Sequence, residues 1–339
     1  MNDKLKGGLV VFLGACSFGV LSTIVKNAYG AGYDLGEVTG SQAFFGMVIL
    51  WAGYWMQRLV TRGRNKASGA SAVSGAKPTV WWKVCLPGIF TGLVSVFYYK
   101  CVQLIPASIA IILLMQNLWI SIILDYLFFR KRPARLQIIA AVIVLGGTLF
   151  AGGLFNNEAA DVSVEGIAYG LLSGFCYALF ILTSGRVGND LPVFKKSALM
   201  ITGACVMIFL IFRPTFFFDG TMIGGLYKWG LPLALLGTVI PPLFFSYGMP
   251  KTGVSLGAIL SAAELPVAVL SSFFILQEHV EWLQWVGVAL ILGAISMTNI
   301  RFRKRRKNHS PASSGGYRDF VFSSLKPDWV TLNKIMLFA

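Results

Sequence analysis

The stretch GVSLGAILSAAELPVAVLSSFFIL, residues 253–276, is long and apolar enough to cross a bilayer as one helix, yet it carries Glu264 and Pro266 near its middle. An isolated carboxylate at mid-depth is costly, so we expect Glu264 to face a watery cavity, to pair with a donor, or to be protonated. Proline has no backbone N–H, so we expect Pro266 to bend the helix and to free the carbonyl of Ala262 as an acceptor.

The composition excludes an ordinary soluble protein. Of the 339 residues, 56% are hydrophobic and 13% are charged, with a mean hydropathy of +0.70, whereas soluble domains hold about 45–50% apolar and about 25% charged residues. The net charge of +15 would suggest nucleic acid in a soluble protein, but the basic residues are dispersed over loops beside apolar runs. We therefore expect the lipid bilayer, and no nucleic acid, as a partner.

The apolar runs predict an all-α integral membrane protein with ten transmembrane helices. About twenty residues are needed to cross about 30 Å of hydrocarbon, and the runs divide at charges, glycines and prolines. The expected helices span residues 7–27, 37–57, 80–104, 106–129, 134–154, 166–185, 192–212, 229–249, 253–276 and 281–300.

The charges of the loops predict the orientation. If the N-terminus is cytoplasmic, one side collects Lys4, Lys6, Arg58, Arg62, Arg64, Lys66, Lys77, Lys83, residues 130–132, Arg135, Lys195, Lys196, Lys251 and residues 301–307. The other side collects the acids Asp34, Glu37, Glu158, Asp161, Glu165, Asp219, Glu278 and Glu281, with few cations beyond Lys26, Lys100, Arg213 and Lys228. This asymmetry follows the positive-inside rule and requires an even number of crossings. We expect a multi-pass protein of the plasma (bacterial inner) membrane with both termini cytoplasmic and a basic tail over residues 301–339.

The chain is internally duplicated. A shift of 147 (255 − 108) places residues 255, 283, 284 and 293 on identical residues at 108, 136, 137 and 146, and a shift of 160 (174 − 14) does the same for residues 174, 176 and 183. The predicted repeats cover residues 7–154 and 166–300, with five helices each. Because five is odd, the second repeat enters the membrane from the opposite side, which makes the repeats inverted.

Inverted repeats place a solute site near the bilayer midplane between the halves. Under the 147-residue shift, Asn117 is the counterpart of Glu264, and Trp119 is the counterpart of Pro266. The candidate substrate-binding residues are Glu264, Asn117, Gln116, Trp119, Pro266, Tyr177, Tyr99 and Tyr247. They supply a carboxylate, amides and aromatic walls with polar tips.

Each candidate also has a structural explanation. Amides often join transmembrane helices, a carboxyl group can form an interhelical hydrogen bond, and tryptophan and tyrosine often pack or anchor at the interface. Asp125 and Lys100 lie near helix ends, where they are expected to reach the interface. Small residues permit close helix approach, which is the simplest role of Gly146, Gly147, Gly287 and Gly293.

Several motifs resemble the drug/metabolite transporter superfamily and, within it, the EamA-type ten-helix carriers. They are Cys16-Ser17-Phe18-Gly19, residues 255–260 leading into Glu264-Leu265-Pro266, Gln277-Glu278, and residues 287–293. The resemblance covers about residues 9–299 and implies a carrier fold, with cargo that varies among amino acids, nucleosides, organic cations and other metabolites. In the first half, Trp119 and Lys131 stand where such carriers commonly have proline and glutamate, so the cargo does not transfer by analogy.

The favoured interpretation is a secondary transporter that moves a small organic solute, an amino acid or a similar metabolite, by alternating access and in the direction of export. Glu264 would contact a cationic group or exchange protons as the coupling ion. The alternative is a nucleotide-sugar or phosphorylated-metabolite exchanger. Anionic cargo demands basic residues inside the helices, and only Lys26, Lys100 and Arg186 come near.

Other classes are disfavoured. A non-transporting membrane scaffold would have a dry, packed centre, whereas a polar cavity lined by Glu264 and Asn117 would favour transport. An enzyme, a metal site or a cofactor is not expected, because the two histidines, His279 and His309, lie outside the predicted helical interior and no nucleophile, metal or phosphate-loop motif is present.

Overall fold

The computed structural model describes residues 3–68, 80–105, 107–130, 132–151, 163–275, 277 and 280–307. This part of the chain is helical and contains no strand. In chain order the helices are α1 (Asp3–Gly19), α2 (Leu21–Gly30), α3 (Leu35–Ser68), α4 (Trp81–Leu104), α5 (Ala107–Leu114), α6 (Asn117–Phe129), α7 (Arg135–Ala151), α8 (Val164–Ser184), α9 (Val193–Ile211), η2 (Thr215–Phe217), η3 (Met222–Leu226), α10 (Tyr227–Leu233), η4 (Ala234–Val239), α11 (Ile240–Thr252), α12 (Val254–Ser261), α13 (Glu264–Ile275) and α14 (Trp282–Lys307).

Eight helical segments of the described chain are long and apolar enough to cross a membrane, some of them made of consecutive helices. They are Asp3–Gly30, Leu35–Val60, Trp81–Leu104, Ile109–Phe129, Val164–Ser184, Val193–Ile211, Met222–Thr252 and Val254–Ile275. The other two predicted crossings correspond to the shorter apolar helices Arg135–Ala151 and Trp282–Met297. At 1.5 Å per residue, these are a little shorter than the hydrocarbon core of about 30 Å. The structure thus shows a multi-pass helical protein, and the number ten stays a prediction.

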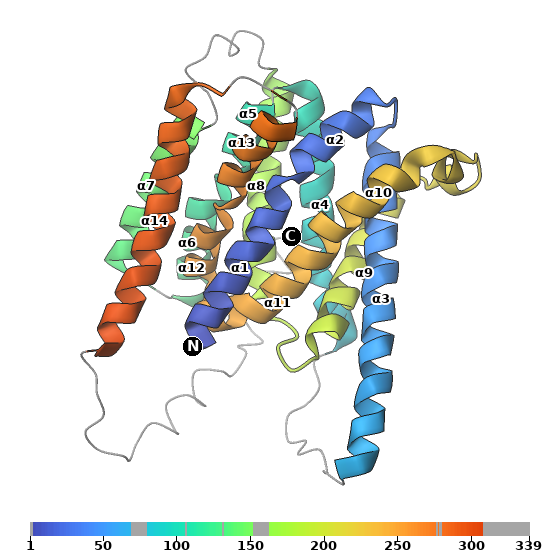
Figure 1. Ribbon diagram of the computed structural model, residues 1–339, viewed down its shortest axis with the longest axis horizontal. Helices are drawn as coiled ribbons and strands as arrows, with labels where there is room; N and C mark the ends of the chain where they lie inside the picture. The colour runs from blue at the N-terminus through green and yellow to red at the C-terminus, as the bar shows by residue number, and fades with distance from the viewer. Residues whose placement is uncertain are drawn as a thin grey trace.

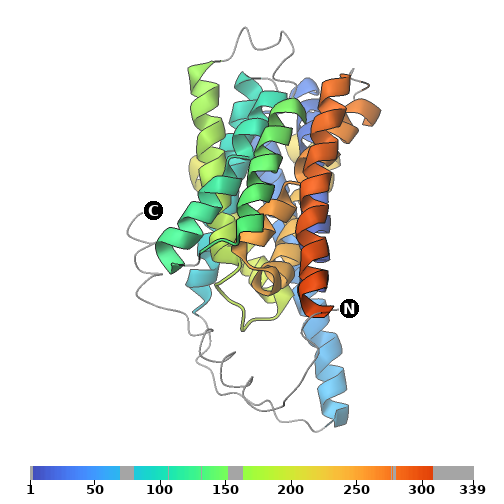
Figure 2. The same cartoon turned by 90° about the vertical axis from the view of Figure 1, so that its left-hand side faces the viewer.

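The helices form an elongated bundle with a central group and two flanks. Figure 1 shows α7 and α14 as a pair on one flank and α3 with α9 on the other, and these pairs are in contact. The N-terminus and the last turns of α14 lie at the same end of the bundle in Figures 1 and 2; we call it the N-terminal end. α14 continues through Lys307, into the predicted tail, while residues 308–339 lie outside the described chain.

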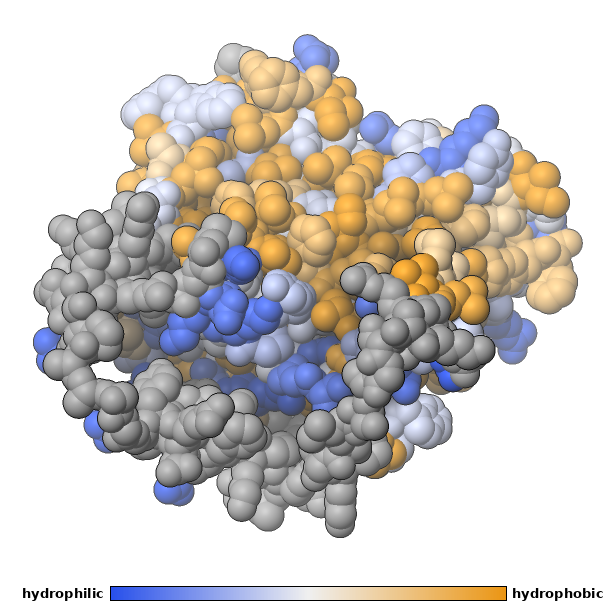
Figure 3. Space-filling view, turned by 60° about the horizontal axis from the view of Figure 1, so that its bottom comes forward, coloured by the Kyte–Doolittle hydropathy of each residue, from blue (hydrophilic) through white to orange (hydrophobic). Residues whose placement is uncertain are grey.

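The outside of the bundle is apolar along its length. Side chains such as Leu127, Val142 and Leu210 are at least 64% exposed. Figure 3 shows a broad hydrophobic surface along the side and hydrophilic residues gathered at the end that comes forward. An exposed apolar surface of this extent is what lipid contact requires.

Close backbone approach depends on particular glycines. A Cβ on Gly88 of α4 would lie 1.6 Å from the carbonyl oxygen of Met200 on α9, so the two backbones touch there. The predicted role in helix approach is confirmed for Gly147 and Gly287, since a Cβ on Gly287 would lie 2.5 Å from the carbonyl oxygen of Gly147. The prediction is wrong for Gly146 and Gly293, because a Cβ added to either residue would have nothing within 4 Å.

Candidate functional site

Two helical segments of the central group, α5–α6 and α12–α13, are each interrupted, and the two breaks occur at corresponding positions of the predicted repeats. α5 and α12 each have 8 residues, and α6 and α13 then begin at Asn117 and Glu264, which the 147-residue shift places on each other. The backbone bonds of the first break run from Gln116 N to Leu113 O, Leu118 N to Met115 O and Ile120 N to Gln116 O. Those of the second run from Ala263 N to Leu260 O, Leu265 N to Ala262 O and Val267 N to Ala263 O, each displaced by the same shift.

Proline is not the common cause of these breaks. Pro266 lies in the first turn of α13, and the corresponding residue of α6 is Trp119, yet both helices are interrupted alike. The carbonyl of Ala262, which we predicted to be free, accepts a hydrogen bond from Leu265 N at 3.2 Å. That prediction is wrong because the chain turns more tightly at the break and brings another donor to the carbonyl.

Glu264 lies inside the bundle, at the second break. Its side chain is buried, with the residue only 5% exposed, and its Oε2 accepts a long hydrogen bond of 3.5 Å from the hydroxyl of Tyr177 on α8. Tyr177 packs edge-on against Phe18, with ring centroids 6.0 Å apart. A Cβ on Gly19 would lie 2.4 Å from the carbonyl oxygen of Glu264, so only glycine lets α1 approach this break so closely. The structure therefore brings Glu264 and Tyr177 together, as expected of a shared site.

Asn117 occupies the first break and is fully buried, with 0% exposure. Its Nδ2 donates to the carbonyl of Leu114 at 2.8 Å, which caps the end of α5. Its Oδ1 has no hydrogen-bond partner among the described residues. Gly174 of α8 lies over this break, since a Cβ there would be 2.9 Å from the carbonyl oxygen of Leu113.

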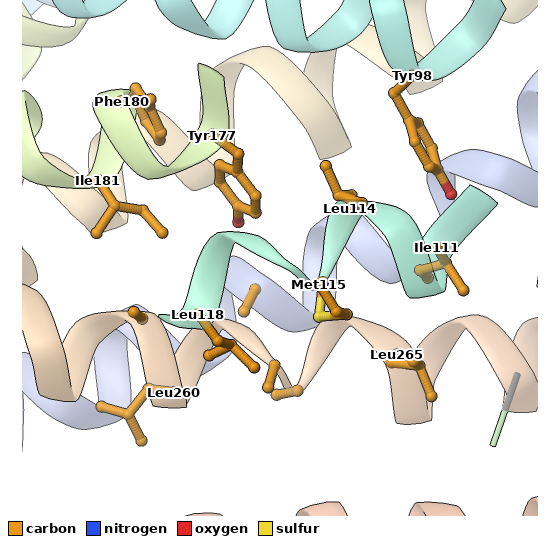
Figure 4. Packing of buried hydrophobic residues seen from close by; sticks show 14 of the residues in the cluster. Tyr98, Ile111, Leu114, Met115, Leu118, Tyr177, Phe180, Ile181, Leu260 and Leu265 are labelled. Carbon is orange, nitrogen blue, oxygen red and sulfur yellow. The ribbon is translucent and has the colours of Figure 1, made fainter. Parts of the chain in front are cut away.

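The α5–α6 and α12–α13 segments lie close together. α6 contacts α12, and Figure 4 shows the two segments running in opposite directions, with Leu118 and Met115 on one and Leu260 and Leu265 on the other. In the same view the hydroxyl of Tyr177 points toward the first turn of α6. One tyrosine thus faces both breaks.

Gln116 and Trp119 form a separate local pair. Gln116 donates to the carbonyl of Ile112 at 3.0 Å and accepts from the indole N–H of Trp119 at 2.8 Å. Trp119 is 44% exposed, on the outside of the bundle. The structure does not place this indole beside Tyr177, and its position suits an interfacial or lipid contact.

The two remaining tyrosines have different surroundings. Tyr99 is buried and donates to Oε1 of Gln42 on α3 at 2.9 Å. Tyr247 is 37% exposed, and Nζ of Lys251 lies 3.3 Å from its ring centroid. Tyr99 therefore belongs to the buried polar interior, whereas Tyr247 lies with a basic residue near the end of α11.

Gln42 is a buried polar residue that the sequence analysis missed. It is 2% exposed, and its backbone carbonyl accepts from Thr238 at 3.2 Å in the π-helical turn η4. That wide turn precedes Pro241 and Pro242, which cannot donate to the carbonyls four residues earlier, so the backbone adopts a wider spacing. An amide inside a predicted crossing was the signal that selected Gln116 and Asn117, and it could also have selected Gln42.

A buried ion pair joins three helices at the N-terminal end of the bundle. Arg186, just after α8, pairs with Asp125 of α6 through Nη2, and Ser255 of α12 donates to the other carboxylate oxygen at 3.4 Å. The guanidinium also lies over the ring of Phe129, 3.5 Å from its centroid. Asp125 is only 3% exposed, so the expectation that it reaches the interface is wrong: the basic partner just after α8 holds it inside.

A second cation lies inside the same end. Lys196, expected in a basic loop, is 1% exposed within α9. Its Nζ donates to the carbonyl of Ser184 at 2.6 Å and to Oδ1 of Asn189 at 2.9 Å. A cation at the last carbonyls of α8 is stabilised by the helix dipole, so Lys196 caps that helix. Within the described residues, no group of three His, Cys, Asp or Glu side chains could hold a metal ion.

Known proteins resemble this chain over most of its length. The uncharacterized transporter YcbK of Bacillus subtilis is 22% identical over 310 residues, which is 90% of this chain and 95% of YcbK. The threonine/homoserine exporter RhtA of Escherichia coli K12 is 25% identical over 228 residues, 65% of this chain and 72% of RhtA. One crystal structure with 17% sequence identity covers 86% of this chain and 96% of its own, with a TM-score of 0.61, and so shares the fold.

The pattern of one transporter family matches the chain twice. The EamA-like transporter family matches residues 5–153 and again residues 164–300, so the two matches together span nearly all of the described helices. Each match contains one of the two interrupted helices, with Asn117 in the first and Glu264 in the second. By these matches, the chain belongs to the EamA-like transporter family.

Proposed function

We propose that this transporter is a secondary carrier that moves a small organic solute, an amino acid or a similar metabolite, by alternating access. The observation that carries the proposal is the pair of helix breaks at the same register, with the buried carboxyl of Glu264 at one and the buried amide of Asn117 at the other. Broken helices in protein-lined interiors are the usual means by which carriers expose polar backbone to a solute.

The break pattern supports an inverted-repeat architecture of ten crossings. Two related halves would produce two family matches, equal lengths of α5 and α12, and opposite directions of the two interrupted helices. In this architecture the site lies between the halves, and closure of one face accompanies opening of the other. Basic residues at the N-terminal end would place that end, with both termini, on the cytoplasmic side of the cell membrane.

The substrate class follows from the charges available. An anionic cargo, such as a nucleotide sugar, would need a basic partner in the interior. The two interior cations described above are engaged: Arg186 with Asp125, and Lys196 with the carbonyl of Ser184 and with Asn189. The described interior instead offers the acidic group of Glu264, which favours a cationic or zwitterionic solute. The RhtA relative is named for the export of threonine and homoserine, so amino-acid export is the specific activity to test first.

The burial of Glu264 and Asn117 also bears on the scaffold alternative. A packed centre is what a scaffold would have, but a carrier passes through a closed state in which both faces are shut. The described structure also contains a groove of about 410 Å³, which is lined by apolar residues of α7 and α14 such as Ile143 and Leu290 and so suits lipid rather than a polar solute. Membership of a transporter family favours the closed-carrier interpretation.

The experiment is counterflow in proteoliposomes that hold the purified full chain, with a panel of amino acids, organic cations, uncharged metabolites and acidic metabolites. We expect Glu264→Gln to abolish counterflow of the best solute, or to remove its pH dependence if protons are the coupling ion. Glu165, which is exposed in the first turn of α8, supplies the matched control Glu165→Gln, which should transport normally. Unchanged transport and pH dependence in Glu264→Gln would contradict the assigned role of this residue.

A further inference from the structure

The structure carries a more specific inference about the chemistry of the solute, and it rests on the proposed transport function. We propose that the two helix breaks together form a binding site for an ammonium group that bears N–H donors, with the Glu264 carboxyl group and the Asn117 Oδ1 atom as its acceptors. The site discriminates a primary ammonium group from its trimethylated analogue.

α8 brings the two acceptors to one place. Gly174 lies over the first break, since a Cβ there would be 3.5 Å from the backbone nitrogen of Asn117. Tyr177, three residues later, is on the same face of α8 and reaches Glu264 at the second break. Three residues advance about 4.5 Å along a helix, so both breaks face a single turn of α8. The proposed ammonium group lies between the two breaks, beside this turn.

Among the described residues, Asn117 Oδ1 has no donor and the Glu264 carboxyl has a long contact with Tyr177. The Nδ2 of Asn117 is fixed on the carbonyl of Leu114, an acceptor, so the free end of this amide is the oxygen. That oxygen is buried with no hydrogen-bond partner among the described residues. The described partner of the Glu264 carboxyl is the Tyr177 hydroxyl, at the long distance of 3.5 Å. Buried acceptors normally have donors, so the unpaired oxygen of Asn117, next to the long contact of Glu264, points to a ligand that supplies donors.

A cation with several donors is the partner that suits both acceptors. A positive charge complements the carboxylate, and an N–H-bearing ammonium can donate to Glu264, to Asn117 Oδ1 and to the Tyr177 oxygen at once. The ring of Tyr177, packed edge-on against Phe18, adds an aromatic wall. A quaternary ammonium would satisfy the charge of Glu264 but leave Asn117 Oδ1 without a donor. Specificity for a donor is strong when the competing ligand leaves a buried polar group unpaired.

The test compares matched ligands on the purified full chain. The probes are ethanolamine with choline, and L-threonine with its N,N,N-trimethyl betaine, and the readout is the concentration that half-saturates the thermal stabilisation of the protein in detergent. We expect at least one primary ammonium probe to bind about tenfold more tightly than its trimethylated partner, the ratio for one charged hydrogen bond. Equal binding within both pairs, or no stabilisation by either primary probe, would overturn the inference.

A variant separates the role of Asn117 from that of the rest of the site. Asn117→Leu keeps a similar volume and removes the acceptor. We expect it to weaken the primary probe about tenfold and to leave the trimethylated probe within about twofold, which makes that probe an internal control. Equal loss for both probes would contradict the assigned role. If the variant does not fold, the comparison of matched probes on the unmodified chain still tests the ammonium site.

The counterflow panel distinguishes this inference from the proposed function. Transport of an uncharged or acidic metabolite with no preference for primary ammonium solutes would refute the ammonium site and leave the carrier function intact. Counterflow of no solute at all, with the protein folded and inserted, would count against the carrier function itself.

Discussion

Removal of either charge of the Asp125–Arg186 pair should destabilise the protein, and unequally. In Arg186→Gln the Asp125 side chain, which is 5% exposed, keeps the contact with Ser255 at 3.4 Å as its remaining hydrogen bond among the described residues. In Asp125→Asn the Arg186 side chain, which is 19% exposed, still donates to the carbonyl of Leu182 at 3.3 Å, and its guanidinium lies over the ring of Phe129. We therefore expect a loss of about 4 kcal/mol in the free energy of unfolding for Arg186→Gln and about 2 kcal/mol for Asp125→Asn.

The double variant is the decisive member of this series. When Asp125→Asn and Arg186→Gln are combined, no unpaired charge remains, so the free energy of unfolding should fall by only about 3 kcal/mol. The two single losses add to about 6 kcal/mol, so the interaction energy between the two positions is about 3 kcal/mol. The assay is equilibrium unfolding of the purified chain in mixed micelles by SDS, followed by tryptophan fluorescence. Glu165→Gln serves as the neutral control because this side chain is exposed. Additive losses, or a larger loss for Asp125→Asn than for Arg186→Gln, would refute the reasoning.

Two further predictions concern packing and capping. Gly88→Ala should lower the free energy of unfolding by about 3 kcal/mol or more, or prevent folding, because the new Cβ would lie 1.6 Å from the Met200 carbonyl oxygen. Gly146→Ala should leave the melting temperature unchanged or raise it, because its new Cβ would have nothing within 4 Å. Similar melting temperatures for both variants would show that α4 and α9 are not packed this closely. Ser163→Ala should cost about 1 kcal/mol in unfolding by SDS, since Ser163 Oγ accepts from Gly166 N at 3.0 Å and caps α8, and a variant as stable as the parent would exclude that cap.

Much of the fold could be predicted because lipid imposes a length and a composition on each crossing. The predicted span of residues 80–104 agrees with α4 to within one residue, since a polar stretch with Lys77 and Pro78 precedes it and the Ile105-Pro106 turn follows it. The spans of residues 106–129 and 253–276 were predicted as continuous helices, yet both are interrupted. Hydropathy averages over a window and therefore does not detect a change of hydrogen-bond register within an apolar run.

The candidate site was predictable only in part. Glu264 and Asn117 could be selected because a carboxyl or amide group is costly inside a crossing. Their relation to Tyr177 depends on which face of α8 meets the breaks, and one sequence does not specify that packing. Asp125 and Arg186 were missed as a pair because they are 61 residues apart and each lies near a helix end, where an interfacial position is the default expectation.

For the proposed alternating-access carrier, the ion pair at the N-terminal end has a consequence for transport kinetics. The sequence shifts that relate the halves place Ser272 where Asp125 stands and Lys26 where Arg186 stands, so the acid occurs in one half only. In a carrier whose halves exchange conformations, contacts of unequal strength give the inward-facing and outward-facing states unequal populations. Without a gradient, the fluxes in the two directions must still be equal. The unequal populations therefore appear as different half-saturation concentrations of the solute on the two faces of the membrane. The maximum transport rates in the two directions differ in the same ratio, which keeps the fluxes equal.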